Sequence, residues 1–204
     1  MKQNKMIVLG ITGGIGAGKT TVLSYLKENY AVVAVQADHV GYLLMRPGGP
    51  CYDPMLSLFG ERILNPDRSI NRKTVGALVF TNLELLQRLN AIIHPKVQEY
   101  IQARIDEERS RGTAFFVVEA ALLLEAGYDA ICDDLWYIDV DEAVRRERLK
   151  QERGYSDQKI TNILANQMKP EEFRQRCQYT IRNNGDLAYT YRQIDQRMKR
   201  YEIM

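Results

Sequence analysis

A glycine-rich stretch near the start of the chain has the residue types that bind phosphate. From Gly13 to Thr20 the sequence matches G-x-x-x-x-G-K-[ST] at every constrained position. Glycines let successive backbone N–H groups turn inward around an anion, Lys19 adds a positive charge for the β- and γ-phosphates, and the Thr20 hydroxyl suits Mg²⁺. The stretch predicts a nucleoside triphosphate site formed by Gly13, Gly14, Ile15, Gly16, Ala17, Gly18, Lys19, Thr20 and Thr21.

The flanks of this loop supply the elements that must position it. An apolar run over residues 6–11 precedes the loop, and Val22, Tyr25 and Leu26 follow at helical spacing. A phosphate-binding loop of this kind joins a buried strand to a helix N-terminus, whose unpaired N–H groups face the phosphates. These flanks favour a genuine phosphate site over a glycine-rich turn that matches by chance.

Further apolar runs alternate with helical patterns along the rest of the chain. Strands are expected at residues 31–35, 114–118, 135–140 and 179–182. Buried strands joined by helical crossovers form a parallel sheet, and ligands collect at the carboxyl ends of its strands. The predicted fold class is therefore α/β, with a five-stranded parallel sheet in a single domain over residues 1–204.

Asp38 lies just past the carboxyl end of the second expected strand. Its carboxylate could accept the proton of a hydroxyl that approaches the γ-phosphate, which would make it a general base. An aspartate at a strand-to-helix turn also commonly caps the helix that follows. The residues alone leave both interpretations open.

Composition narrows the class of protein. The 204 residues are 45% hydrophobic, and 28 Lys plus Arg against 26 Asp plus Glu give a net charge of +2. Such a balance argues against a dedicated nucleic-acid or membrane-surface protein. The 3 cysteines lack metal or C-x-x-C spacing, and no run is long enough to span a membrane, so a cytoplasmic protein is expected.

The stretch between Asp38 and the third strand is longer than a crossover requires, by several tens of residues. Turn signals occur at residues 47–50 and 65–67, and Asn71 is expected to open a helix. His94-Pro95 is expected to start a long helix, because proline suits a first turn. The pattern predicts a helical insertion over residues 41–95.

Residues 141–153 are rich in arginine and follow the fourth strand. Arginines beside a phosphate site suggest a lid over residues 143–156 that contacts the transferring phosphoryl group. The same run contains three oppositely charged i,i+4 pairs, which are typical of a solvated helix face: Asp141–Arg145, Glu142–Arg146 and Arg148–Glu152.

Several motifs together resemble the bacterial type of the dephospho-coenzyme A kinase family. They are the phosphate loop, Ala37-Asp38, Phe59-Gly60, Ile70-Asn71-Arg72, Leu89-Asn90 with His94-Pro95, Leu122-Leu123, Gln167 and Asn183-Asn184-Gly185. The resemblance implies ATP- and Mg²⁺-dependent phosphorylation of the ribose 3′-hydroxyl of dephospho-coenzyme A, the last step of coenzyme A synthesis. It also implies a P-loop NTPase core like that of nucleoside monophosphate kinases, with an acceptor-binding insertion and a lid.

The resemblance further implies roles for individual residues. Lys19, Asp38 and Arg148 would be catalytic, Arg153 and Asn183 would bind ATP with the loop, and Asp38, Arg72 and His94 would bind the acceptor. Asn183-Asn184-Gly185 is also an ordinary turn sequence.

The chain departs from the family pattern at Gln36, Glu119 and Arg145, where we expect Asp, Asp and Gln. Glu119 ends the third expected strand at the ligand edge, where it could hold a Mg²⁺-bound water together with Thr20. It could instead begin a helix with favourable dipole placement.

Two other functions remain open from the sequence. One is a P-loop kinase for another nucleotide-like or small hydroxyl acceptor, and the other is a nucleotide-dependent regulatory module. The expected partner is a small-molecule substrate, with no nucleic acid and no membrane, and a monomer is expected rather than an oligomer.

Overall fold

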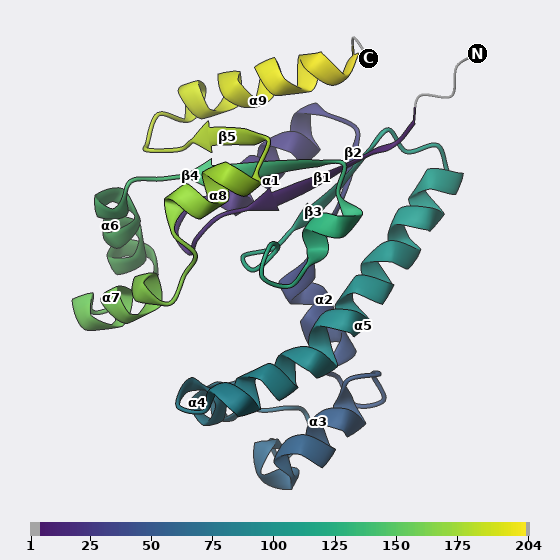
Figure 1. Ribbon diagram of the computed structural model, residues 1–204, viewed down its shortest axis with the longest axis vertical. Helices are drawn as coiled ribbons and strands as arrows, with labels where there is room; N and C mark the ends of the chain where they lie inside the picture. The colour runs from purple at the N-terminus through teal and green to yellow at the C-terminus, as the bar shows by residue number, and fades with distance from the viewer. Residues whose placement is uncertain (1–4, 203–204) are drawn as a thin grey trace. The chain divides into compact units, whose positions relative to one another are not determined.

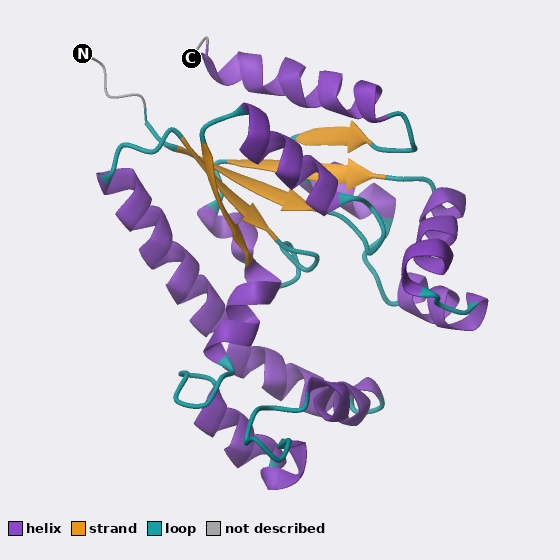
Figure 2. Cartoon of the chain, turned by 180° about the vertical axis from the view of Figure 1, so that it is seen from behind, coloured by secondary structure: helices purple, strands orange, loops and turns teal. Residues whose placement is uncertain are grey.

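A five-stranded parallel sheet organises the computed structural model, which describes residues 5–202 (Figure 1). The spatial order of the strands is β2-β3-β1-β4-β5, and Figure 2 shows them pointing the same way. Their bounds are β1 Ile7–Thr12, β2 Val32–Gln36, β3 Phe115–Glu119, β4 Asp134–Asp139 and β5 Tyr179–Arg182. All five expected strands are confirmed, each within one residue of the predicted bounds.

Helices connect these strands and fill the long insertion. They are α1 Lys19–Asn29, α2 Ala37–Leu44, α3 Tyr52–Phe59, α4 Arg72–Phe80, α5 Leu83–Ser110, α6 Glu142–Arg153, α7 Asp157–Ala165, α8 Pro170–Arg176 and α9 Leu187–Glu202, with short 3₁₀ helices η1 Glu61–Ile63 and η2 Tyr128–Ile131. Within residues 5–202, none of these helices is long and apolar enough to cross a membrane.

The chain divides into two compact units. The sheet unit comprises the chain up to Ala34 and from Glu108 onward, and the helical unit comprises Val35–Glu107. The proposed acceptor-binding insertion, residues 41–95, falls inside the helical unit, and its role in binding stays a prediction.

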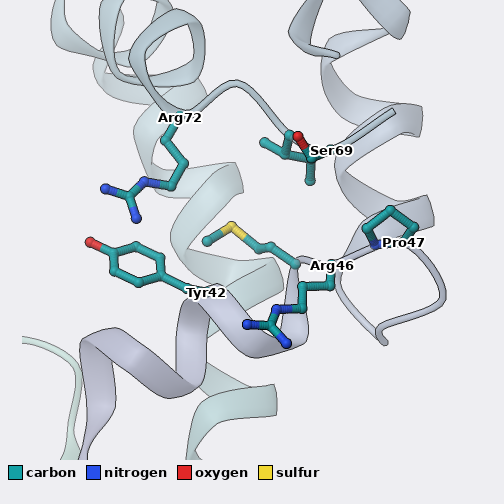
Figure 3. A pocket seen from close by; sticks show the side chains of 7 residues that line it. Tyr42, Arg46, Pro47, Ser69 and Arg72 are labelled. Carbon is teal, nitrogen blue, oxygen red and sulfur yellow. The ribbon is translucent and has the colours of Figure 1, made fainter. Parts of the chain in front are cut away.

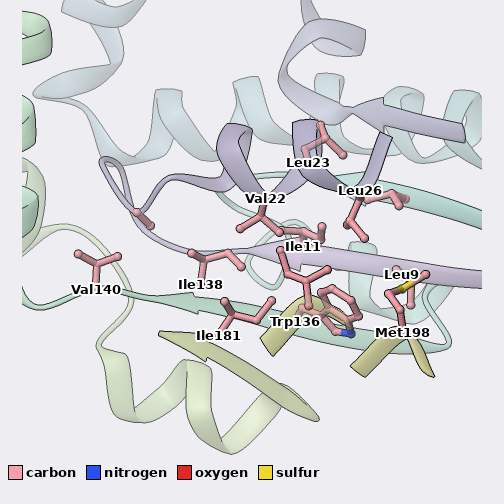
Figure 4. Packing of buried hydrophobic residues seen from close by; sticks show 13 residues of the cluster. Leu9, Ile11, Val22, Leu23, Leu26, Trp136, Ile138, Val140, Ile181 and Met198 are labelled. Carbon is pink, nitrogen blue, oxygen red and sulfur yellow. The ribbon is translucent and has the colours of Figure 1, made fainter. Parts of the chain in front are cut away.

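The core of the sheet unit lies where β1, β4 and β5 pack against α1 and α9 (Figure 4). Leu9 and Ile11 of β1 and Leu26 of α1 are fully buried, because a parallel strand is covered on both faces. Trp136 of β4 is also fully buried, and its indole N–H donates to Asp134 at 3.0 Å. The buried side of β1 anchors the loop that follows it.

The helical unit has a separate, smaller core. Met55, Phe59, Ile63 and Val75 form its buried centre. Asn71 caps α4 as expected, since its side chain accepts from the Thr74 backbone N–H at 3.1 Å.

The expected start of the long helix is wrong. Helix α5 begins at Leu83, where the Asn82 side chain accepts from the Leu85 N–H at 2.9 Å, and Pro95 lies inside it. Proline cannot donate to the preceding turn and its ring crowds that turn, so an interior proline bends a helix. Figure 1 shows α5 bending near its middle. After the proline, Val97, Ile101 and Ile105 are buried at helical spacing and form one face of α5.

Candidate functional site

The phosphate loop joins β1 to α1, as its flanking sequence predicts. Gly13, Gly16 and Gly18 have φ angles of 149°, 76° and 84°, a region that other residues rarely adopt. A Cβ on Gly13 would lie 2.8 Å from the Ile138 carbonyl oxygen, and one on Gly18 would lie 2.3 Å from Nδ2 of Asn183. Glycine is therefore required here both for the backbone conformation and because neighbouring residues leave no room for a side chain.

Lys19, the first residue of α1, turns its ammonium group back onto the loop. Its Nζ donates to the Gly13 carbonyl at 2.8 Å and lies 3.5 Å from the Gly14 carbonyl. Oε1 of Glu119 is 3.9 Å away, and the Glu119 side chain is almost wholly buried. The cationic end of Lys19 is thus held at the mouth of the glycine-rich loop by carbonyls and one carboxylate.

Glu119 is the last residue of β3. Residues 121–127 form turns before the 3₁₀ helix η2, so the interpretation of Glu119 as the start of an α-helix is wrong. The carboxylate instead lies at the carboxyl edge of the sheet, beside the charged end of Lys19.

Two arginines of α6 contact the phosphate loop. Nε of Arg145 donates to the Ile15 carbonyl at 3.1 Å, and its Nη2 donates to Oε1 of Gln167. Arg148 donates to the Gly16 carbonyl at 3.4 Å and to the Asn183 carbonyl at 2.7 Å. Burial lowers the pKa of the Arg145 guanidinium, an effect that neighbouring acidic groups oppose. The loop is therefore braced by α6 through its carbonyl groups.

These contacts correct the surface-pair interpretation for two of the three predicted pairs. Among residues 5–202, only Glu142 and Arg146 form the expected i,i+4 ion pair on α6, at 2.7 Å. Arg145 and Arg148 face the loop instead, because its carbonyls offer partners away from solvent. Ser156 caps α7, since its side chain accepts from the Lys159 N–H at 3.3 Å.

Asn183, at the end of β5, is buried beside the loop. Its Nδ2 donates to the Ala17 carbonyl at 2.9 Å, and its Oδ1 accepts from Thr190 at 3.0 Å. These bonds show that Asn183 does more than form a surface turn. It links the loop to the last strand and to α9.

Comparisons with known proteins agree with this geometry. The family model for dephospho-CoA kinase matches residues 7–189. The chain belongs to the dephospho-CoA kinase family. A dephospho-CoA kinase of Geobacter sulfurreducens is 36% identical over 191 residues, covering 94% of this chain and 96% of the relative. A dephospho-CoA kinase of Dehalococcoides mccartyi is 36% identical over 179 residues, which cover 88% of this chain and 89% of the relative.

Solved structures support the same fold. A Thermus thermophilus protein aligns with a TM-score of 0.80 at 26% identity, covering 96% of this chain and 97% of that one. A dephospho-CoA kinase of Campylobacter jejuni aligns with a TM-score of 0.69 at 21% identity, and the alignment covers 94% of this chain and 95% of that one. A shikimate kinase of Acinetobacter baumannii aligns with a TM-score of 0.58 at 14% identity, over 98% of this chain and 97% of that one. At so low an identity, this likeness shows the P-loop kinase fold alone.

The sheet unit brings together most of the predicted nucleotide-site residues of this dephospho-CoA kinase family member. Lys19, Glu119, Arg148 and Asn183 all lie at the loop, and exposed Thr20 lies in the first turn of α1. Arg153 is exposed at the end of α6, and the structure gives it no hydrogen bond or ion pair among the described residues. Its role in binding ATP stays a prediction.

Asp38 lies in the first turn of α2, in the helical unit. The helix begins at Ala37 and its N-cap is Gln36, with no side-chain bond to the helix. The interpretation of Asp38 as a cap is therefore wrong. Its carboxylate is exposed and makes no hydrogen bond within the described part of the chain, which leaves it available to a ligand.

Arg72 lines a pocket in the helical unit, with a cavity volume of about 160 Å³ (Figure 3). Its guanidinium carbon lies 3.7 Å from the centre of the Tyr42 ring, a cation–π contact. The pocket is lined by Tyr42, Met45, Arg46, Pro47, Ser69, Ile70 and Arg72. His94, the other predicted acceptor residue, is half-buried within α5, and burial lowers its pKa.

Sequence reasoning missed the loop contact of Arg145 and the pocket residues Tyr42 and Arg46. From the sequence, Arg145 belongs to the arginine-rich lid, departs from the family pattern and is spaced to pair with Asp141, and none of these features indicates a contact with Ile15. Tyr42 offered one signal, because it lies four residues after Asp38 and so shares its helix face. Arg46 follows the end of α2, and no spacing pattern in the sequence indicates that it lines a pocket.

Proposed function

We propose that this chain transfers the γ-phosphoryl group of ATP to the ribose 3′-hydroxyl of dephospho-coenzyme A. The observation that carries the proposal is the glycine cradle with Lys19 at its mouth, in a chain that matches the dephospho-CoA kinase family over residues 7–189. A glycine-rich loop with left-handed backbone at Gly16 and Gly18, followed directly by a helix N-terminus, fits the phosphates of a nucleoside triphosphate.

The proposed roles follow from charge and position. Lys19 would exchange its loop carbonyls for the β- and γ-phosphates, and Arg148 would stabilise the charge that develops during transfer. Asp38 would orient the 3′-hydroxyl and accept its proton. Positioning and electrostatic stabilisation of the reacting groups are the main contributions of a protein to phosphoryl transfer.

Thr20 and Glu119 are the residues that would hold Mg²⁺. Residues 5–202 contain no group of three or more His, Cys, Asp or Glu side chains able to hold a metal. That composition fits an ion held mainly by nucleotide phosphates and waters, with one hydroxyl and one carboxylate from the protein. Mg²⁺ would neutralise phosphate charge, while Lys19 and the loop N–H groups orient the phosphates.

The test measures ADP release with and without dephospho-coenzyme A, and identifies the product by mass spectrometry. ADP should form in proportion to acceptor, and the product should carry one added phosphoryl group at the ribose. Lys19→Ala should remain folded and lose nearly all transfer, because Lys19 binds phosphate rather than the core. ADP release that is indifferent to the acceptor would overturn the proposal.

A further inference from the structure

The pocket of the helical unit holds two arginines without acidic partners. Arg46 and Arg72 make no ion pair or side-chain hydrogen bond among the described residues, and the pocket lining includes no carboxylate. Two other arginines of the helical unit are paired, Arg68 with Glu61 and Arg104 with Glu107. Arg62 and Arg88 form no ion pair among residues 5–202, but they lie outside the pocket. Two uncompensated guanidinium groups at one pocket attract a ligand that carries two negative charges.

The pocket also orients these groups. The ring of Tyr42 lies beneath the Arg72 guanidinium at 3.7 Å, so that the planar donor group is fixed before a ligand arrives. Figure 3 shows both guanidinium groups on the Tyr42 side of the pocket, with Pro47 and Ser69 on the other side. Met45, Pro47 and Ile70 add apolar walls, while Arg46 and Arg72 themselves are exposed and open to a ligand.

The position of the pocket along α2 matches the shape of a nucleoside diphosphate. Asp38 and Tyr42 share one face of the helix, one turn or roughly 6 Å apart. A ribose ring separates its 3′-hydroxyl from its 5′-phosphate by a similar span. A ligand whose 3′-hydroxyl meets Asp38 therefore has its 5′-diphosphate within reach of the arginines.

We infer that Arg46, Arg72 and Tyr42 form a subsite for the 5′-diphosphate of the acceptor, and that Arg46 and Arg72 each bind one of its two phosphoryl groups. This inference rests on the proposed function, and it assigns the part of the acceptor that the helical unit recognises. It makes the subsite a determinant of specificity, because acceptors without a 5′-diphosphate leave both arginines unused.

The experiment compares Arg46→Gln with Arg62→Gln, a matched control at an exposed arginine of η1 outside the pocket. Titration calorimetry of dephospho-coenzyme A should show roughly 10- to 100-fold weaker binding to Arg46→Gln, and KM for this acceptor should rise by a similar factor with kcat nearly unchanged. Arg62→Gln should behave as the parent protein. Adenosine, which lacks the diphosphate, should bind the parent and Arg46→Gln equally.

The outcomes separate this inference from the proposed function. If the parent protein phosphorylates dephospho-coenzyme A but Arg46→Gln binds it as tightly as Arg62→Gln does, the subsite is wrong and the function stands. An equal loss of adenosine and dephospho-coenzyme A binding in Arg46→Gln also overturns the subsite, since it indicates distortion of the pocket. If the parent neither binds nor phosphorylates dephospho-coenzyme A, the proposed function itself fails.

Discussion

Asp38 is a carboxylate that the folded helical unit does not use. Since it caps nothing and makes no hydrogen bond within residues 5–202, its replacement by asparagine removes charge without removing a contact. Asp38→Asn should lower kcat by roughly 10²- to 10⁴-fold if the carboxylate accepts the hydroxyl proton. The loss should fall at the lower end if it mainly orients the hydroxyl, because the transition state of phosphoryl transfer is loose.

The measurement is steady-state kinetics of Asp38→Asn beside its thermal midpoint. KM for ATP and the midpoint should both stay near the parent values. An unchanged turnover, or a stability loss large enough to explain the lost activity, would remove Asp38 from the catalytic assignment.

Arg145 holds the peptide of Ile15 within the phosphate loop, so it acts on nucleotide affinity through backbone orientation. Arg145→Gln should raise KM for ATP by roughly 10-fold and change kcat less, because one charge-assisted hydrogen bond to the loop is lost. Arg146→Gln is the control on the same helix, since Arg146 pairs with Glu142 on the surface. Equal effects of the two substitutions would show that Arg145 contributes only to the stability of α6.

The arginines of α6 also show where residue-level prediction stops. The i,i+4 spacing is present for three pairs, but partner choice depends on which face of the helix is turned toward the loop. Ile15 and Gly16 lie more than a hundred positions earlier in the chain. Local charge spacing could therefore predict the surface pair of Arg146, and it could not predict the loop contacts of Arg145 and Arg148.

At the scale of elements, strands were easier to predict than helix ends. Strands β1, β3 and β4 are short runs that are almost wholly buried, and β2 is a half-buried apolar run, so composition locates them. The start of α5 was misplaced because His94-Pro95 looks like a first turn, while packing of Leu89, Ile92 and Ile93 onto the helical core carries the helix through the proline. Asn82, a residue favoured at N-caps, was the available signal for the true start.

His94 makes α5 sensitive to acid. Burial holds the folded-state pKa of His94 below its ordinary value of 6.5, so the unfolded chain binds the proton more readily. Stability should therefore fall as pH drops through 6.5 and should level off below the folded-state pKa. His94→Gln should remove this part of the decline, with little change near pH 8.

Thermal midpoints of the parent and His94→Gln, measured between about pH 8 and pH 5, test this assignment. His39 is exposed, and His39→Gln serves as the control that should keep the acid-dependent decline. Parallel curves for the parent and His94→Gln would contradict the assignment.

At the scale of the molecule, the sequence indicated both the sheet and the helical insertion, because a crossover does not need so many residues. It did not indicate that each part has its own buried centre. One cluster of buried residues, with Leu9, Ile11 and Trp136, lies in the sheet unit, and another, Met55, Phe59, Ile63 and Val75, lies in the helical unit. The helical unit, Val35–Glu107, is the smaller of the two, and a smaller unit buries a smaller share of its surface, so it is expected to have the lower local stability.

The fluorescence of Trp136 can distinguish unfolding of the sheet unit from unfolding of the helical unit. Trp136 is the single tryptophan of the chain, and it lies fully buried in the sheet unit, hydrogen-bonded to Asp134. Its emission should therefore respond to unfolding of the sheet unit alone, whereas far-ultraviolet ellipticity also records the helices of the helical unit. In a urea titration the ellipticity should begin to fall before the emission shifts to the red. Superimposable curves would show one cooperative transition, and native emission from a partly unwound protein would identify the sheet unit as the part that persists.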